Sequence, residues 1–311
     1  WPIQPLEYRW IPNGKVAGTD SKNKGRVFKF GAGFYADDGA LLFESREDLD
    51  IGTPAVHKHL KRFGLLMHTG TQEKKSKTEV MYCPPHRKDV ILPEHVAPVK
   101  VDNEGGIVTF TDTFKYLGSR IHQSLQDDAD VDGRIKSATC AFGALKKSIF
   151  GSKHIKLATK KAVYLAIILN ILLYGAESWC LTEKLLQRLR VFHNQCIRSM
   201  CRVTRWHTRK HRISNKVLRD RLKMETIDQY ISERKLRWAG HVARMDHSRL
   251  PRKFLTSWVR HPRPVGRPQY TFGHSLNKTL ERAGIPTVSK TWRELAQDRA
   301  NWRKLTQNKI T

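Results

Sequence analysis

Residues 26–43, RVFKFGAGFYADDGALLF, contain the stretch Phe34-Tyr35-Ala36-Asp37-Asp38-Gly39, which decides the fold. Two apolar runs rich in aromatic residues, Val27 to Phe34 and Ala40 to Phe43, flank Asp37-Asp38-Gly39, where a tight turn between antiparallel strands is expected. The pattern predicts a β-hairpin with carboxylates at its tip. Because Asp and Gly are also ordinary turn residues, the short motif alone does not decide a function.

Adjacent carboxylates on a rigid turn suit a particular chemistry. Hard divalent cations such as Mg²⁺ or Mn²⁺ take oxygen ligands and usually keep several waters. Nucleotidyl transfer uses two such ions about 4 Å apart to activate the attacking hydroxyl and to stabilise the leaving group. Asp37 and Asp38 are therefore the candidate metal ligands.

The rest of the N-terminal part mixes helix and strand signals. Thr53 can cap a helix with Pro54 at its first position, and Gly64 follows the apolar pattern of that helix. Strand signals return at 79–82, 106–110 and 115–117. We therefore expect an α+β domain over residues 1–130.

From about Val131 the spacing of apolar residues becomes helical. Three helices, near 132–149, 153–175 and 182–203, predict an all-α bundle over 131–212, and another helix begins near Thr226. Residues 213–311 read as a basic helical extension with a Pro- and Arg-rich linker near 250–268 and a capping box, Thr291-Trp292-Arg293-Glu294, before the last helix. The longest apolar stretch, 162–176, is shorter than the roughly 20 residues of a membrane helix.

Several segments, in this order, resemble reverse transcriptases of retrotransposons without long terminal repeats. The Tyr-Ala-Asp-Asp hairpin is similar to the active-site box of that family, and 62–65 (RFGL) with 75–81 (KSKTEVM) to the box that follows it. Residues 114–119 (FKYLGS) resemble the primer-grip hairpin. Residues 168–179 (ILNILLYGAESW), 235–241 (KLRWAGH) and the turn Gly266-Arg267-Pro268 resemble the region after the polymerase. The resemblance implies part of a polymerase palm, a helical thumb and a basic extension.

The resemblance also implies roles for individual residues. Asp37 would bind metal with Asp38 beside it, Tyr35 would line the primer or nucleotide side, and Lys77 would protonate the leaving pyrophosphate. The turn Tyr116-Leu117-Gly118 would hold the primer end. Without the resemblance, Lys77 reads as a solvated lysine and the turn as a plain hairpin. The implied partners are an RNA template, a DNA primer and deoxynucleotides, in the nucleus.

One departure from the family concerns the second metal. A competent polymerase has another metal-binding aspartate on an upstream strand and a fingers region, yet only 34 residues precede Tyr35. Asp20 lies in a loop-like sequence and is a poor substitute. Because the chain also opens abruptly with Trp1-Pro2, we expect it to be a fragment that needs the upstream part of the same polyprotein and does not polymerise alone.

The charge is strongly asymmetric. The net charge is +28, and residues 1–130 hold 18 basic and 18 acidic residues whereas 131–311 hold 39 and 11. Such an excess points to a polyanion. Nucleic acid is favoured over a membrane surface because the basic residues lie on helices with interior-type apolar faces rather than beside a lipid anchor. A solvated helix face remains the simpler explanation of any single run. The candidate nucleic-acid-binding residues are Lys146, Lys147, Lys160, Lys161, Arg188, Arg190, Arg198, Arg237 and Arg267.

The cysteines indicate a reduced, intracellular protein. They are five in number and contain no Cys-x-x-Cys pair. His193, Cys196, Cys201, His207 and His211 raise the question of zinc, but their spacing matches no standard finger, and Cys196 falls on an apolar helix face. Core packing is favoured and no zinc is expected. The alternative to an enzyme fragment is a non-catalytic nucleic-acid-binding remnant of such an element.

Overall fold

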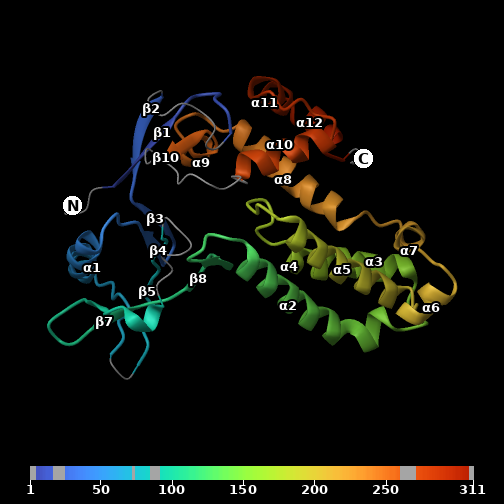
Figure 1. The fold of residues 1–311 in the computed structure, drawn as a ribbon, viewed down its shortest axis with the longest axis horizontal. Coiled ribbons are helices and arrows are strands. Elements are labelled where there is room, and N and C mark those ends of the chain that lie inside the picture. Colours follow the sequence, from blue (N-terminus) through green and yellow to red (C-terminus); the bar gives the residue numbers. More distant parts are fainter. Residues whose placement is uncertain (1–4, 17–24, 72–73, 85–91, 260–270, 308–311) are drawn as a thin grey trace. The chain divides into compact units, whose positions relative to one another are not determined.

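The structure is a computed structural model that describes residues 5–16, 25–71, 74–84, 92–259 and 271–307. The chain forms two compact units (Figure 1). The first comprises 1–11, 20–126 and 257–268, and the second 12–19, 127–256 and 269–311. The small sheets lie in the first unit, and the second is built of helices, so the α+β class predicted from the sequence is confirmed.

A three-stranded antiparallel sheet in the first unit brings together distant parts of the chain. Its order is β10-β1-β2, from Ser257–Val259, Leu6–Trp10 and Arg26–Phe30. Tyr8 lies opposite Phe28, and their stacked rings have centroids 5.5 Å apart. The prediction of one strand over Val27 to Phe34 is wrong, because β2 pairs with β1 and the chain enters a different sheet after Gly31.

The next elements are a hairpin and a helix. The hairpin consists of β3 (Ala32–Tyr35) and β4 (Asp38–Leu41), and α1 spans Arg46–Lys61. The predicted helix start at Thr53 is wrong, because Ser45 caps the helix by accepting the Asp48 N–H at 3.0 Å and Pro54 lies inside it. Gly64 follows the helix with φ of 73°, as its position in the sequence predicts.

A small core holds the rest of the first unit together. The sheet order β5-β7-β6 joins Glu79–Val80, Ile107–Phe110 and Val99–Lys100, with the short 3₁₀ turn η2 at Pro93–His95. Val99 and Val108 lie opposite each other and are fully buried, and Leu49 of α1 joins their cluster. A second hairpin follows, with β8 at Thr113–Tyr116 and β9 at Ser119–His122.

The second unit begins with a helical bundle. Its elements are α2 (Asp128–Leu145), η3 (Lys146–Phe150), α3 (Leu157–Val163), η4 (Tyr164–Ile168), α4 (Leu169–Leu172), α5 (Glu183–Met200), α6 (Arg205–Lys210), α7 (Asn215–Leu222) and α8 (Ile227–Ala243). A continuous apolar cluster runs from Val131 to Ile231 and includes Trp179 and Ile197. The three helices predicted for this region are therefore present.

A second apolar cluster joins α8 to the end of the chain. It packs α8 against α9 (Leu250–Leu255), α10 (Phe272–Arg282), α11 (Ser289–Gln297) and α12 (Arg299–Gln307). The indole N–H of Trp302 donates to the Leu236 carbonyl at 3.0 Å, and a Cβ added at Gly240 would lie 2.1 Å from that nitrogen. Gly240 therefore permits the close packing of α12 on α8.

Two boundaries near the C-terminus differ from the prediction. The proposed linker contains α9 and β10 up to Val259, and the remainder of it lies outside the described residues. The capping box at Thr291 does not start a helix, because α11 already begins at Ser289 and ends before Asp298. In the described ranges, no helix is both long and apolar enough to span a membrane.

Candidate functional site

The Tyr-Ala-Asp-Asp segment forms the tip of the β3–β4 hairpin. Tyr35 pairs with Asp38, so Ala36 and Asp37 are the two turn residues and Asp38 begins β4. Ala36 has φ of 52°, a left-handed conformation that an alanine rarely adopts. The Phe34 ring lies over Gly39, where an added Cβ would come within 3.0 Å of it. Asp37, Asp38 and Tyr35, which is 68% exposed, all face solvent.

The primer-grip-like segment forms a second tight hairpin. Its turn residues Leu117 and Gly118 have φ of 46° and 84°, the sign that a type I′ turn requires at both positions. Tyr116 stacks on Phe114 with centroids 6.3 Å apart. The Tyr116 hydroxyl lies 4.0 Å from the position that a Cβ on Gly33 would take. The structure thus brings Tyr116 against the strand that carries the Tyr-Ala-Asp-Asp turn.

The hairpin tip offers two carboxylates, those of Asp37 and Asp38, to a metal ion. Magnesium and manganese sites are built from several oxygen ligands. In the part of the chain that the structure describes, no cluster of three or more His, Cys, Asp or Glu side chains could hold a metal ion. Asp37 and Asp38 alone therefore do not fit the two ions of nucleotidyl transfer. Asp20, the only upstream candidate in the sequence analysis, lies outside the described residues.

Lys77 lies on a different part of the first unit. Its backbone N–H donates to the His68 ring at 3.1 Å, and the neighbouring Ser76 hydroxyl donates to the His68 carbonyl at 2.6 Å. The side chain is exposed, and among the described residues no ion pair joins it to Asp37 or Asp38. Its predicted role as a proton donor stays a prediction.

The predicted nucleic-acid-binding residues fall into distinct environments. Lys146, Lys147 and Arg237 are exposed, and Arg198 is half-buried at the end of α5. Lys161 bonds to the Lys223 carbonyl, and Arg188 pairs with Asp132. Arg267 lies outside the described residues. Only some of these side chains therefore have a free charge to offer to a polyanion.

Lys160 is buried and not part of a basic surface. Its side chain is 2% exposed, and its ammonium group donates to the Met200 carbonyl at 3.3 Å. Burial, and then repulsion from Arg202, lower the pKa of this amine. The prediction that Lys160 lies on an exposed basic face is wrong, because its ammonium group holds the C-terminus of α5 instead.

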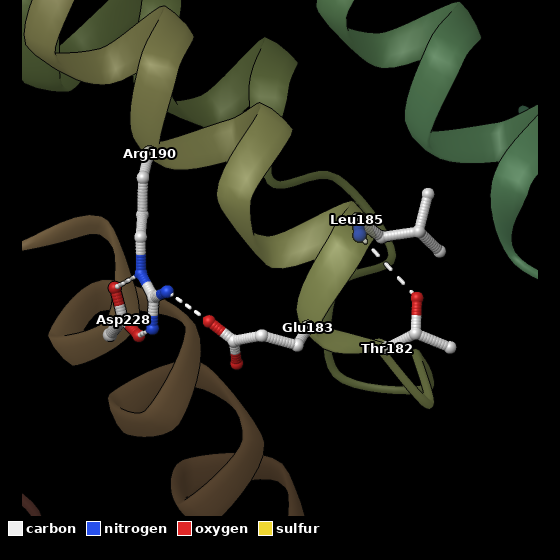
Figure 2. Close-up of polar contacts among 5 residues, drawn as sticks. All are labelled: Thr182, Glu183, Leu185, Arg190 and Asp228. Atoms are coloured by element: carbon white, nitrogen blue, oxygen red, sulfur yellow. Dashed lines mark hydrogen bonds and ion pairs between the residues drawn. The ribbon is translucent and has the colours of Figure 1, made fainter.

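Arg190 is committed to an internal ion pair. Figure 2 shows its guanidinium bonded to Asp228 of α8 and to Glu183. The two hydrogen bonds to the Asp228 carboxylate are 2.9 and 2.6 Å long. The hydrogen bond to Asp228 is the main cause that raises the pKa of Arg190. The prediction of a phosphate-binding Arg190 is corrected accordingly, because two carboxylates already neutralise it.

We expect Arg190→Gln to lower the free energy of unfolding by about 1–3 kcal/mol, because it leaves Asp228 without its bidentate partner. RNA affinity should change little. Urea unfolding followed by circular dichroism measures the first quantity and fluorescence anisotropy with labelled RNA the second. Arg237→Gln, at an exposed position, is the control that should leave stability within about 0.5 kcal/mol. Unchanged stability together with a large loss of RNA affinity would show that Arg190 contributes to nucleic-acid binding.

Of the residues considered for zinc, His193 and Cys196 are buried in the bundle, whereas His207 and His211 are exposed. Cys196 is buried in the bundle core as its helical position predicts, and burial raises its pKa to about 12. The His193 ring bonds to the Tyr164 hydroxyl at 2.8 Å and to the Glu225 carbonyl at 3.1 Å. The sequence analysis did not single out Arg202 and Arg205. Arg202 follows Arg198 by four residues and Arg205 follows Arg202 by three, a spacing that would have indicated one cationic cluster.

A comparison with known proteins finds a distant relative. A Caenorhabditis elegans protein described as transposon-derived and uncharacterized is 27% identical over 194 residues, which cover 61% of this chain and 68% of that protein. The chain is a distant homologue of a transposon-derived protein. No protein-family model matches the chain, and no solved structure matches it. The similarity supports an origin in a transposon and leaves the specific activity to be argued from the residues.

Proposed function

We propose that the chain is a portion of the reverse transcriptase of a retrotransposon without long terminal repeats, which copies RNA into DNA. The observation that carries this proposal is the exposed Asp37 turn, with Tyr116 of the second hairpin packed against Gly33 of the same β3 strand. The order of the segments along the sequence and the distant transposon-derived relative support it.

In this proposal, the hairpin supplies only part of a catalytic centre. Asp37 and Asp38 would be ligands of Mg²⁺ or Mn²⁺, ions that would supply activation of the primer hydroxyl and stabilisation of pyrophosphate. Tyr35 and the Tyr116-Leu117-Gly118 turn would lie on the primer side, and Lys77 near the leaving group. Since Asp37 and Asp38 alone make an incomplete ligand set, the missing ligand and the fingers would come from the upstream part of the same polyprotein.

The helical unit would bind the template–primer duplex. Residues 131–311 carry 39 basic against 11 acidic residues, and exposed Lys146, Lys147 and Arg237 are placed on this unit. Cations that meet phosphates release counterions, so affinity should fall steeply with salt and depend little on sequence. This activity does not need the metal ligands.

The incomplete ligand set also favours a second candidate, a non-catalytic nucleic-acid-binding remnant of the same kind of element. The two candidates agree on binding and differ on synthesis. Under the first, primer extension appears when the upstream segment of the element is supplied and disappears with Asp37→Ala. Under the second candidate, primer extension stays absent when the upstream segment is supplied.

We expect the 311-residue chain to bind an RNA–DNA hybrid and not to extend its primer. Fluorescence anisotropy across 50–300 mM salt measures binding, and denaturing gels with Mg²⁺ or Mn²⁺ measure extension. Asp37→Ala should leave the affinity within about twofold, because an exposed carboxylate repels rather than holds phosphate. Salt-independent or absent binding would contradict the expectation of hybrid binding, and Asp37-dependent extension by the chain alone would contradict the expectation of no synthesis.

A further inference from the structure

A pocket at the C-terminal end of α5 is lined by four cations. Its volume is about 440 Å³, and the cationic side chains are those of Lys146, Arg198, Arg202 and Arg205. Ser199 and Thr204 also line it, whereas no Asp or Glu does. The cations come from two places in the chain: Lys146 follows α2, and the three arginines lie between the last turn of α5 and the first residue of α6.

Within the described part of the chain, these charges have no acidic partner. In the described residues no ion pair reaches any of the four, and Arg198 donates instead to the neutral Asn215 side-chain oxygen at 3.2 Å. Burial, and then repulsion from Arg205, lower the pKa of Arg198. Like charges held together without a counterion favour the binding of an anion, which relieves their mutual repulsion.

The backbone at Arg202 favours a different residue. Arg202 has φ of 57° and follows α5 in a helix-ending turn, in which the Val203 N–H donates to the Arg198 carbonyl at 2.9 Å and the Arg202 N–H to the Ser199 carbonyl at 3.0 Å. Glycine adopts this left-handed conformation without strain, and arginine does not. Arginine at this strained position therefore brings a guanidinium to the pocket. Glycine would be unstrained there but would supply no charge.

We infer that this pocket binds a phosphate group of a nucleic-acid backbone. A guanidinium donates two parallel hydrogen bonds to phosphate oxygens, and hydroxyls such as that of Ser199 add neutral donors. The inference rests on the proposed function for the source of the phosphate, since a free phosphate compound offers the same chemistry. It adds Arg202 and Arg205 to the binding surface and gives that surface a defined anchoring point.

Arg202→Gly tests the inference without harming the fold. The change removes the guanidinium and relieves the left-handed backbone, so the melting temperature should hold or rise. Arg212→Gly is the matched control: Arg212 has φ of 49° in the same kind of turn, where the Ile213 N–H donates to the Thr208 carbonyl at 3.0 Å, yet it does not line the pocket. Both variants lose one positive charge.

We expect Arg202→Gly to weaken binding of a labelled RNA–DNA hybrid about tenfold at 0.15 M salt and to reduce the slope of log affinity against log salt by about one. Arg212→Gly should change the affinity less than about twofold. Equal losses of hybrid affinity in both variants would contradict phosphate binding by the pocket, because the effect would then follow net charge alone. Normal hybrid binding by Arg202→Gly would also overturn it and leave the proposed function standing.

A second arm uses inorganic pyrophosphate in isothermal titration calorimetry. No measurable pyrophosphate binding together with Arg202-dependent hybrid binding supports a nucleic-acid site. If the native chain binds no hybrid but binds pyrophosphate through Arg202, the nucleic-acid source and the proposed function are both overturned, and the pocket is one for free phosphates. If neither ligand binds, the pocket fails together with the proposed function.

Discussion

Replacement of Trp179 with alanine is expected to lower the free energy of unfolding of the helical unit by about 3–5 kcal/mol. The side chain is 1% exposed and belongs to the bundle core. Its indole N–H donates to the Asp130 carboxylate at 2.9 Å, and its carbonyl accepts from the buried Lys235 ammonium at 2.6 Å. The substitution therefore leaves a large cavity and removes a donor from a buried carboxylate, two effects that add.

Urea titration followed by far-UV circular dichroism measures this change, because a lower midpoint at constant slope reports stability alone. Trp206→Ala is the matched control, since Trp206 is 65% exposed and the Lys210 ammonium lies 4.7 Å from the centre of its ring. It should lose at most about 1 kcal/mol. Similar losses at the two positions would contradict the placement of Trp179 in the core.

The bundle was predictable because its signal is local. Leu185, Leu189, Phe192, Cys196 and Met200 recur at spacings of three and four, and all of them are buried on one face of α5. The helix predicted near 182–203 is α5, and in the structure Thr182 caps it by accepting the Leu185 N–H at 3.4 Å (Figure 2). Periodicity thus locates such helices to within a few residues.

The sheets were less predictable because their partners are distant in sequence. A turn at Asp37-Asp38-Gly39 was expected, and the observed turn residues are Ala36 and Asp37. The strands β1 and β10 were not expected, and their pairing joins residues about 250 positions apart. Without β1, nothing in the local pattern separates β2 from β3. The start of α1 was missed for a related reason: Pro54 looked like a first-turn proline, whereas Ser45 had already begun the helix.

The sequence is equally limited in predicting which charged side chains of the candidate site remain free. Lys160 and Lys161 are neighbours in the sequence, yet a helix turns about 100° per residue and only Lys160 is carried into the interior. Arg190 has carboxylate partners 7 and 38 residues away, which no local pattern reveals. Composition therefore predicts a basic unit correctly but does not say which of its cations remain free.

The second large expected effect is a loss of stability at acidic pH. The His193 ring is 1% exposed, and its Nδ1 and Nε2 atoms meet the Tyr164 hydroxyl and the Glu225 carbonyl. Since a carbonyl only accepts, Nε2 carries the proton and the neutral ring accepts from Tyr164 at Nδ1. Burial, the main cause, lowers the pKa of His193 to about 4 from its ordinary 6.5.

We therefore expect the free energy of unfolding to fall by roughly 3 kcal/mol on account of His193 as the pH drops from 6.5 to 4. In this window the unfolded chain takes up a proton that the folded chain does not, so acid favours unfolding; above pH 6.5 the ring is neutral in both states and contributes no pH dependence.

His193→Gln keeps a donor and an acceptor but cannot titrate. Carboxylates titrate in both proteins, so the difference between the two urea-derived stability curves isolates the ring. His154→Gln, at an exposed position, should reproduce the native curve. Parallel curves for the native chain and His193→Gln would show that the ring titrates alike in the folded and the unfolded chain, and would remove it from the core of the bundle.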